Sequence, residues 1–91
     1  MKDLSDWRNE IDELDRQIVA LLNRRANCVL SLAPLKRRQR IQVLDPDREN
    51  EVLRKLRAAN AGPLPDELVE EIFSAVMAAM REIQKEAASV E

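Results

Sequence analysis

Residues 4–40 read LSDWRNEIDELDRQIVALLNRRANCVLSLAPLKRRQR, and this stretch decides the fold. Its apolar residues recur at alternating intervals of three and four, as in the a/d seam of a heptad pattern, which predicts one long helix from Leu4 to about Arg40. The seam comprises Leu4, Trp7, Ile11, Leu14, Ile18, Leu21, Cys28, Leu32 and Leu35. Arg25 takes a seam position where the pattern requires Leu or Ile. Because a guanidinium in an apolar seam is costly unless an anion meets it, Arg25 predicts an anionic partner or ligand.

Two shorter helices follow in the remaining half of the chain. Asp45, with a proline directly after it, is a predicted N-cap, and its helix should run to about Asn60. A Gly-Pro pair ends this helix, and Pro65 opens a third one that runs to about Ala88. The predicted fold class is therefore all-α, with one long and two shorter helices in a single domain over residues 1–91.

Composition excludes several classes of function. The 91 residues are 45% hydrophobic and 35% charged with a net charge of −2, which is typical of a helical bundle and gives no basic surface for nucleic acid. With no histidine, histidine acid–base chemistry is excluded, and we expect neither a metal site nor a cofactor. No apolar run approaches the ~20 residues of a membrane span. The single Cys28 suits a reducing compartment, so we predict a cytoplasmic protein without membrane contact.

The length of the first helix predicts an oligomer. About 36 residues at 1.5 Å each make a helix of ~54 Å. A compact chain of this size has a radius of gyration of ~12 Å, hence a diameter near 30 Å. Two shorter helices of the same chain cannot cover such a helix, so we predict that a second copy packs on it in a homodimer.

Each predicted helix has an apolar face that one polar residue interrupts: Arg25 in the first, Glu49 in the second and Gln84 in the third. Lys36 points within ~20° of Arg25, three turns and ~16 Å along the helix, whereas Arg8 points ~80–100° away. One interpretation is a buried Arg25–Glu49 ion pair that sets helix register, with Gln84 bonded to a backbone carbonyl. The convergence of two cations, an acid and an amide favours instead a cleft that binds a small polyanion.

The order of these residues carries a resemblance to a known family. Arg8, Arg25, Lys36, the DPDRE run of residues 45–49 and Gln84 together resemble the all-helical (AroQ-type) chorismate mutases. The resemblance extends from Asp6 to Gln84 and includes an I-D-x-x-D-x-x-I-x-x-L-L-x-x-R run that ends at Arg25. It implies an intertwined homodimer, three helices per chain, that converts chorismate to prephenate without a cofactor.

The resemblance also implies roles for individual residues. Arg25 and Arg48, with Arg8 contributed by the partner chain, would hold the two carboxylates of chorismate. Lys36 and Gln84 would hydrogen-bond the ether oxygen of the breaking bond.

Glu49, with the backbone near Asp45, would hold the ring hydroxyl. Two positions depart from the family pattern: Met80 stands where many relatives have Ser or another small residue, and Pro34 lies two residues before Lys36.

Two other functions remain open at this point. An isochorismate-pyruvate lyase of the same fold also runs a pericyclic step, and a non-catalytic dimerisation or regulatory domain would use its polar core only to set register. The sequence is also compatible with both a free-standing enzyme and a domain of a fusion protein.

Overall fold

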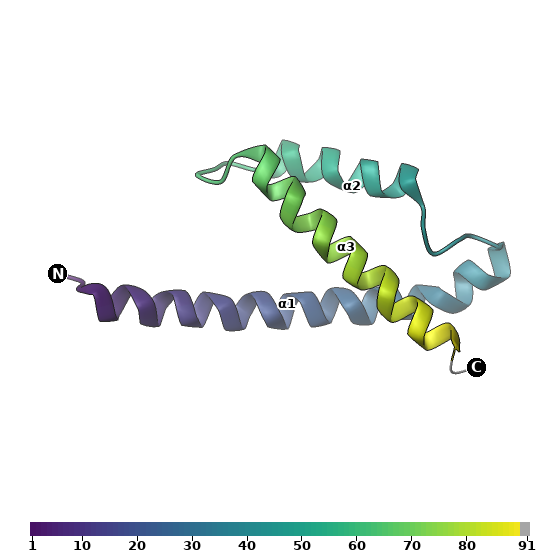
Figure 1. The fold of residues 1–91 in the computed structure, drawn as a ribbon, viewed down its shortest axis with the longest axis horizontal. Coiled ribbons are helices and arrows are strands. Elements are labelled where there is room, and N and C mark those ends of the chain that lie inside the picture. Colours follow the sequence, from purple (N-terminus) through teal and green to yellow (C-terminus); the bar gives the residue numbers. More distant parts are fainter. Residues whose placement is uncertain (90–91) are drawn as a thin grey trace.

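The computed structural model describes residues 1–89, which form three α-helices and no strand (Figure 1). The helices are α1 (Leu4–Gln39), α2 (Pro46–Ala59) and α3 (Asp66–Ser89). This confirms the all-α fold class, and each helix ends within one residue of its predicted end. None of the helices in the described range is both long and apolar enough to cross a membrane.

Capping residues explain where the first two helices begin. Asp3 caps α1 by accepting a hydrogen bond from the backbone N–H of Asp6, whose side chain accepts one from Asp3 in return. Asp45 caps α2 by accepting from the backbone N–H of Arg48 at 3.1 Å, with Pro46 at the first helical position. The cap matters for function because it places Asp45 and Arg48 at one end of α2.

The turn between α2 and α3 is held by polar contacts. Asn60 donates to the carbonyl of Leu64 at 2.7 Å, and Gly62 adopts a φ of +77°, a conformation that favours glycine. Arg57 of α2 donates to Glu70 of α3 at 2.6 Å, and this hydrogen bond raises the pKa of the Arg57 guanidinium. These contacts align α2 and α3 as an antiparallel hairpin.

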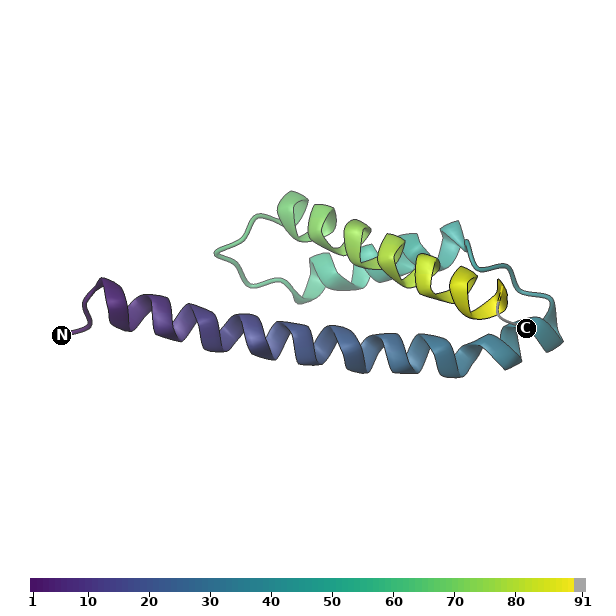
Figure 2. The same ribbon diagram turned by 60° about the horizontal axis from the view of Figure 1, so that its bottom comes forward.

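The long helix α1 extends well beyond the α2–α3 hairpin. α3 packs against both α1 and α2, and in two views the N-terminal part of α1 projects past them (Figures 1 and 2). The molecule measures 56 × 28 × 15 Å, and its radius of gyration is 16.4 Å, against the ~12 Å of a compact chain. A single chain therefore forms an open arrangement with one helix largely uncovered.

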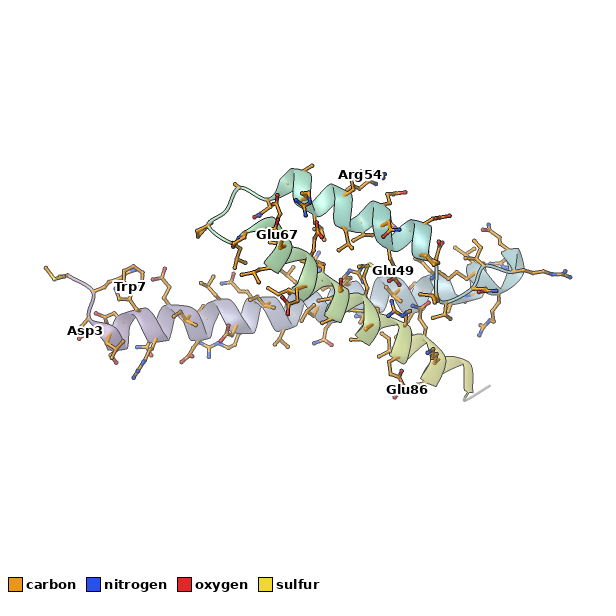
Figure 3. All side chains as sticks on the ribbon, turned by 45° about the horizontal axis from the view of Figure 1, so that its top comes forward. Asp3, Trp7, Glu49, Arg54, Glu67 and Glu86 are labelled. Carbon is orange, nitrogen blue, oxygen red and sulfur yellow. The ribbon has the colours of Figure 1, made fainter. Side chains whose placement is uncertain are left out.

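Very little of this chain is buried within itself. Among the described side chains, only Met77, Met80 and Gln84 of α3 are buried, and α1 has no buried residue. The seam residues Trp7 and Ile11 remain about half exposed, and Figure 3 shows Trp7 on the projecting part of α1 with no other helix beside it. The core of one chain is thus confined to the place where α3 meets α1 and α2.

Candidate functional site

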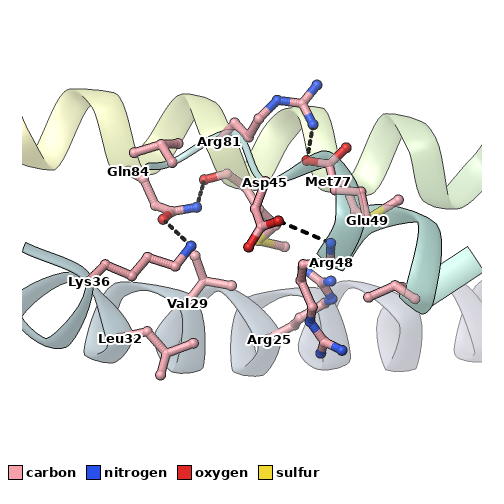
Figure 4. A pocket seen from close by; sticks show the side chains of 13 residues that line it. Arg25, Val29, Leu32, Lys36, Asp45, Arg48, Glu49, Met77, Arg81 and Gln84 are labelled. Carbon is pink, nitrogen blue, oxygen red and sulfur yellow. Dashed lines mark hydrogen bonds and ion pairs between the residues drawn. The ribbon is translucent and has the colours of Figure 1, made fainter. Parts of the chain in front are cut away.

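A pocket lined by both charged and apolar side chains lies at this meeting place, and we call it the central pocket (Figure 4). It has a volume of about 160 Å³ and is formed by the C-terminal half of α1, the start of α2 and the C-terminal half of α3. That volume is below the ~300–1,000 Å³ of complete ligand sites. Its charged and amide side chains are Arg25, Lys36, Asp45, Arg48, Glu49, Arg81 and Gln84.

The helix α1 contributes Arg25 and Lys36, which share one face because eleven residues correspond to about three turns. The Nζ of Lys36 donates to Oε1 of Gln84 at 3.2 Å, so Lys36 reaches α3 across the pocket. Pro34 lies within α1, which continues to Gln39. The proline therefore does not remove Lys36 from the pocket.

Gln84 links Lys36 to the backbone of its own helix. Its side chain is buried, with Oε1 accepting from Lys36 and Nε2 donating to the carbonyl of Met80 at 3.1 Å. The hydrogen bond to the Met80 carbonyl is the one expected if Gln84 only stabilises the fold. The hydrogen bond from Lys36 is an additional contact, which brings a charged side chain of α1 to Gln84. The Met80 side chain is buried and presents apolar surface to the pocket.

The start of α2 contributes two charged side chains to the pocket: Asp45, which caps the helix, and Arg48, which pairs with Glu51. The Nη1 of Arg48 donates to Glu51 at 2.7 Å, and Lys55 also contacts Glu51, at 2.9 Å. Lys55, and to a smaller extent Arg48, holds the pKa of the Glu51 carboxyl below its usual value. Since exposed ion pairs contribute little free energy, Arg48 can turn to a ligand at small cost while Lys55 remains with Glu51.

Glu49 pairs with a residue that sequence reasoning missed. Its carboxylate accepts a hydrogen bond from Arg81 of α3, so the Arg25–Glu49 pair of the alternative, helix-register interpretation is not what the structure contains. Arg81 precedes Gln84 by three residues and so lies on the same face of α3. That spacing is the signal that would have identified it.

Arg8 is the one predicted site residue that the chain does not bring to the pocket. It is exposed on the projecting part of α1 and does not line the pocket. Seventeen residues separate Arg8 from Arg25, which is ~26 Å along the helix axis. An arginine cannot bridge that distance, so Arg8 cannot reach the central pocket of its own chain.

The side chains that line the pocket carry a net positive charge. Four cations and two carboxylates line it, which leaves a net charge of +2. Arginine and lysine donors arranged around a half-enclosed space bind carboxylates or phosphates well. The central pocket therefore suits a small dianion.

Known proteins share this fold and part of this sequence. The family model described as chorismate mutase type II matches residues 7–85. The structure of chorismate mutase (form II) from Thermus thermophilus superposes with a TM-score of 0.87 at 31% sequence identity, covering 92% of this chain and 96% of that one.

Longer proteins match as well. The bifunctional chorismate mutase/prephenate dehydratase of Neisseria gonorrhoeae is 44% identical over 70 residues, which are 77% of this chain and 19% of that protein. The bifunctional chorismate mutase/prephenate dehydratase of Aquifex aeolicus is 29% identical over 89 residues, which are 93% of this chain and 25% of that protein. The chain thus spans about a fifth to a quarter of the length of these curated relatives.

Proposed function

The chain belongs to the chorismate mutase type II family, and on this premise we propose that its central pocket converts chorismate to prephenate. The observation that carries the proposal is the net +2 charge of a pocket built from three helices, which matches a substrate with two carboxylates. The same pocket contains six of the seven residues that the sequence resemblance implies, Arg25, Lys36, Asp45, Arg48, Glu49 and Gln84.

The proposed reaction is a [3,3] rearrangement within one molecule. It forms a carbon–carbon bond while an ether carbon–oxygen bond breaks, so it requires no nucleophile and no net proton transfer. The protein must fold the enolpyruvyl arm of the substrate over its ring and stabilise the electron density that develops on the ether oxygen. Orientation of this kind can supply up to ~7–11 kcal/mol in favourable intramolecular reactions.

Lys36 and Gln84 are the proposed donors to the ether oxygen. Their 3.2 Å contact brings both polar ends to one point of the pocket. An ammonium has three donors, of which Gln84 engages one, so Lys36 retains donors for the substrate. Gln84 would exchange its bond with the Met80 carbonyl for one with the ether oxygen, at little net cost in hydrogen bonds.

The substrate carboxylates and hydroxyl have separate proposed partners. Arg25 and Arg48, which come from different helices, would bind the carboxylates. Two arginines that approach from different directions restrict the enolpyruvyl arm of the substrate better than one arginine does. Glu49 and the backbone near Asp45 would hold the ring hydroxyl. Arg8 of the partner subunit would complete the clamp.

We propose a homodimer because one chain leaves too much apolar surface uncovered. Its accessible area is 7387 Å², whereas a compact monomer of this mass exposes about 5,400 Å². The excess of about 2,000 Å² per chain, or about 4,000 Å² for two chains, falls in the range of the total area buried in obligate homodimers. A second copy laid along α1 would cover the seam and bring its Arg8 toward the small, open pocket of the first.

The direct test is loss of chorismate absorbance after addition of the purified protein, with prephenate identified as product. We expect turnover to continue after exhaustive chelation, because the rearrangement uses orientation and hydrogen bonds alone. Isochorismate, incubated in parallel, should release no pyruvate. Activity that chelation abolishes and a metal restores would contradict the proposed mechanism.

Gln84→Glu is expected to retain activity mainly at acidic pH. Only a protonated carboxyl can donate to the ether oxygen, and an ionised one would repel its growing negative charge. Activity should therefore fall as pH rises through the pKa of the introduced group, measured as kcat/KM against pH. Gln84→Met, of similar size but without a donor, should be impaired at every pH. An unchanged pH profile for Gln84→Glu would exclude Gln84 from the site.

A further inference from the structure

Arg81 and Glu49 form an unusually enclosed ion pair for this open chain. The pair joins α3 to α2 beside the central pocket, and its side chains are only 26% and 25% exposed (Figure 4). Arg57 and Glu70 join the same helices at their other end, but there Arg57 is 46% exposed. Because solvent screens an enclosed pair less, the Arg81–Glu49 pair holds its geometry more firmly.

Glu49 has competing partners within the same pocket. Arg25 and Arg48 line it as well, and a carboxylate that lost Arg81 would pair with one of these arginines. That pairing would withdraw an arginine from an anionic ligand. Removal of the Arg81 charge would also reduce the net charge of the pocket from +2 to +1.

We propose that Arg81 is a positioning residue, which holds the Glu49 carboxylate toward α3 and so keeps Arg25 and Arg48 available for the two carboxylates of the substrate. The inference rests on the proposed function. An ionised carboxylate accepts about four hydrogen bonds, so Glu49 bound to Arg81 still accepts one from the ring hydroxyl. Arg81 thus acts through Glu49 and does not contact the substrate.

The proposal predicts that a double variant is more active than the single variant Arg81→Met. Arg81→Met is expected to lower kcat/KM for chorismate roughly 10- to 100-fold, mainly by raising KM, because the released Glu49 carboxylate neutralises one arginine of the clamp. The double variant Arg81→Met/Glu49→Gln should recover at least roughly threefold over Arg81→Met. An uncharged amide does not compete for the arginines and still accepts from the ring hydroxyl.

Arg57→Met is the matched control, since it removes the ion pairs that join Arg57 of α2 to Asp66, Glu67 and Glu70 of α3. Arg57 does not line the central pocket. The variant should keep kcat/KM within about twofold of the parental value, as expected for an exposed pair. Circular dichroism checks that each variant is folded. Should Arg81→Met fail to fold, Arg81→Gln, which is polar and uncharged, replaces it in the same comparison.

Three results would overturn the proposal. If Arg81 only ties α2 to α3, the double variant will be no more active than Arg81→Met. Parental kcat/KM in Arg81→Met would exclude any role in positioning. A parental protein that does not convert chorismate overturns the proposed function and this inference together, and that result is seen before any variant is compared.

Discussion

Replacing Lys36 with alanine is expected to lower turnover of chorismate by roughly 100- to 1,000-fold, the usual effect of losing one preorganised donor to a developing negative charge. The Nζ of Lys36 lies 3.2 Å from Gln84 in the only part of the chain with buried side chains among those described. The ether oxygen gains electron density only as the bond breaks, so the loss should appear in kcat as well as in kcat/KM. Steady-state kinetics with chorismate measure both.

The control for Lys36→Ala is Arg38→Ala, which removes a cation two residues further along α1. Arg38 is exposed and does not line the pocket, so its loss should leave turnover near the parental value. Thermal unfolding should show little change for either variant, because both side chains reach solvent. Near-parental turnover of Lys36→Ala would mean that Lys36 does not contact the ether oxygen.

Arg8→Ala and Arg25→Ala should each be nearly inactive as homodimers, and mixing them should restore activity. Each variant removes a carboxylate clamp from both sites, if Arg8 acts in the site of the partner chain. Arg8 lies ~26 Å along α1 from Arg25, so one chain cannot supply both residues to one site. The experiment is to unfold the two variants together, refold them and measure kcat.

The expected recovery follows from two-fold symmetry. In a mixed dimer, the chain that keeps Arg25 receives an intact Arg8 from the other chain, so one site is whole while the second carries both defects. Random pairing makes about half of the dimers mixed, so activity should return to about a quarter of the parental value. Native mass spectrometry confirms that mixed dimers form. If they form and activity stays flat, Arg8 does not serve the partner's site.

Part of the candidate site was predictable because it follows from periodicity along a helix. Arg25 and Lys36 share a face by spacing alone, and both line the pocket. The partner of Glu49 was not predictable in this way. Arg25, Arg48 and Arg81 are all plausible partners by charge, and only the packing of α3 against α2 selects Arg81.

The sequence by itself determined the three helices and their ends. Three local patterns mark these helices: the three-four spacing of the seam, the Asp45–Pro46 start and the Gly62–Pro63 stop. Each pattern acts through contacts within about one turn, so it can be recognised from neighbouring residues. Only the tertiary structure decided which charges meet. The Arg81–Glu49 pair spans 32 residues and the Lys36–Gln84 contact spans 48. Such contacts depend on where whole helices lie, and that placement follows from packing of side chains rather than from local pattern.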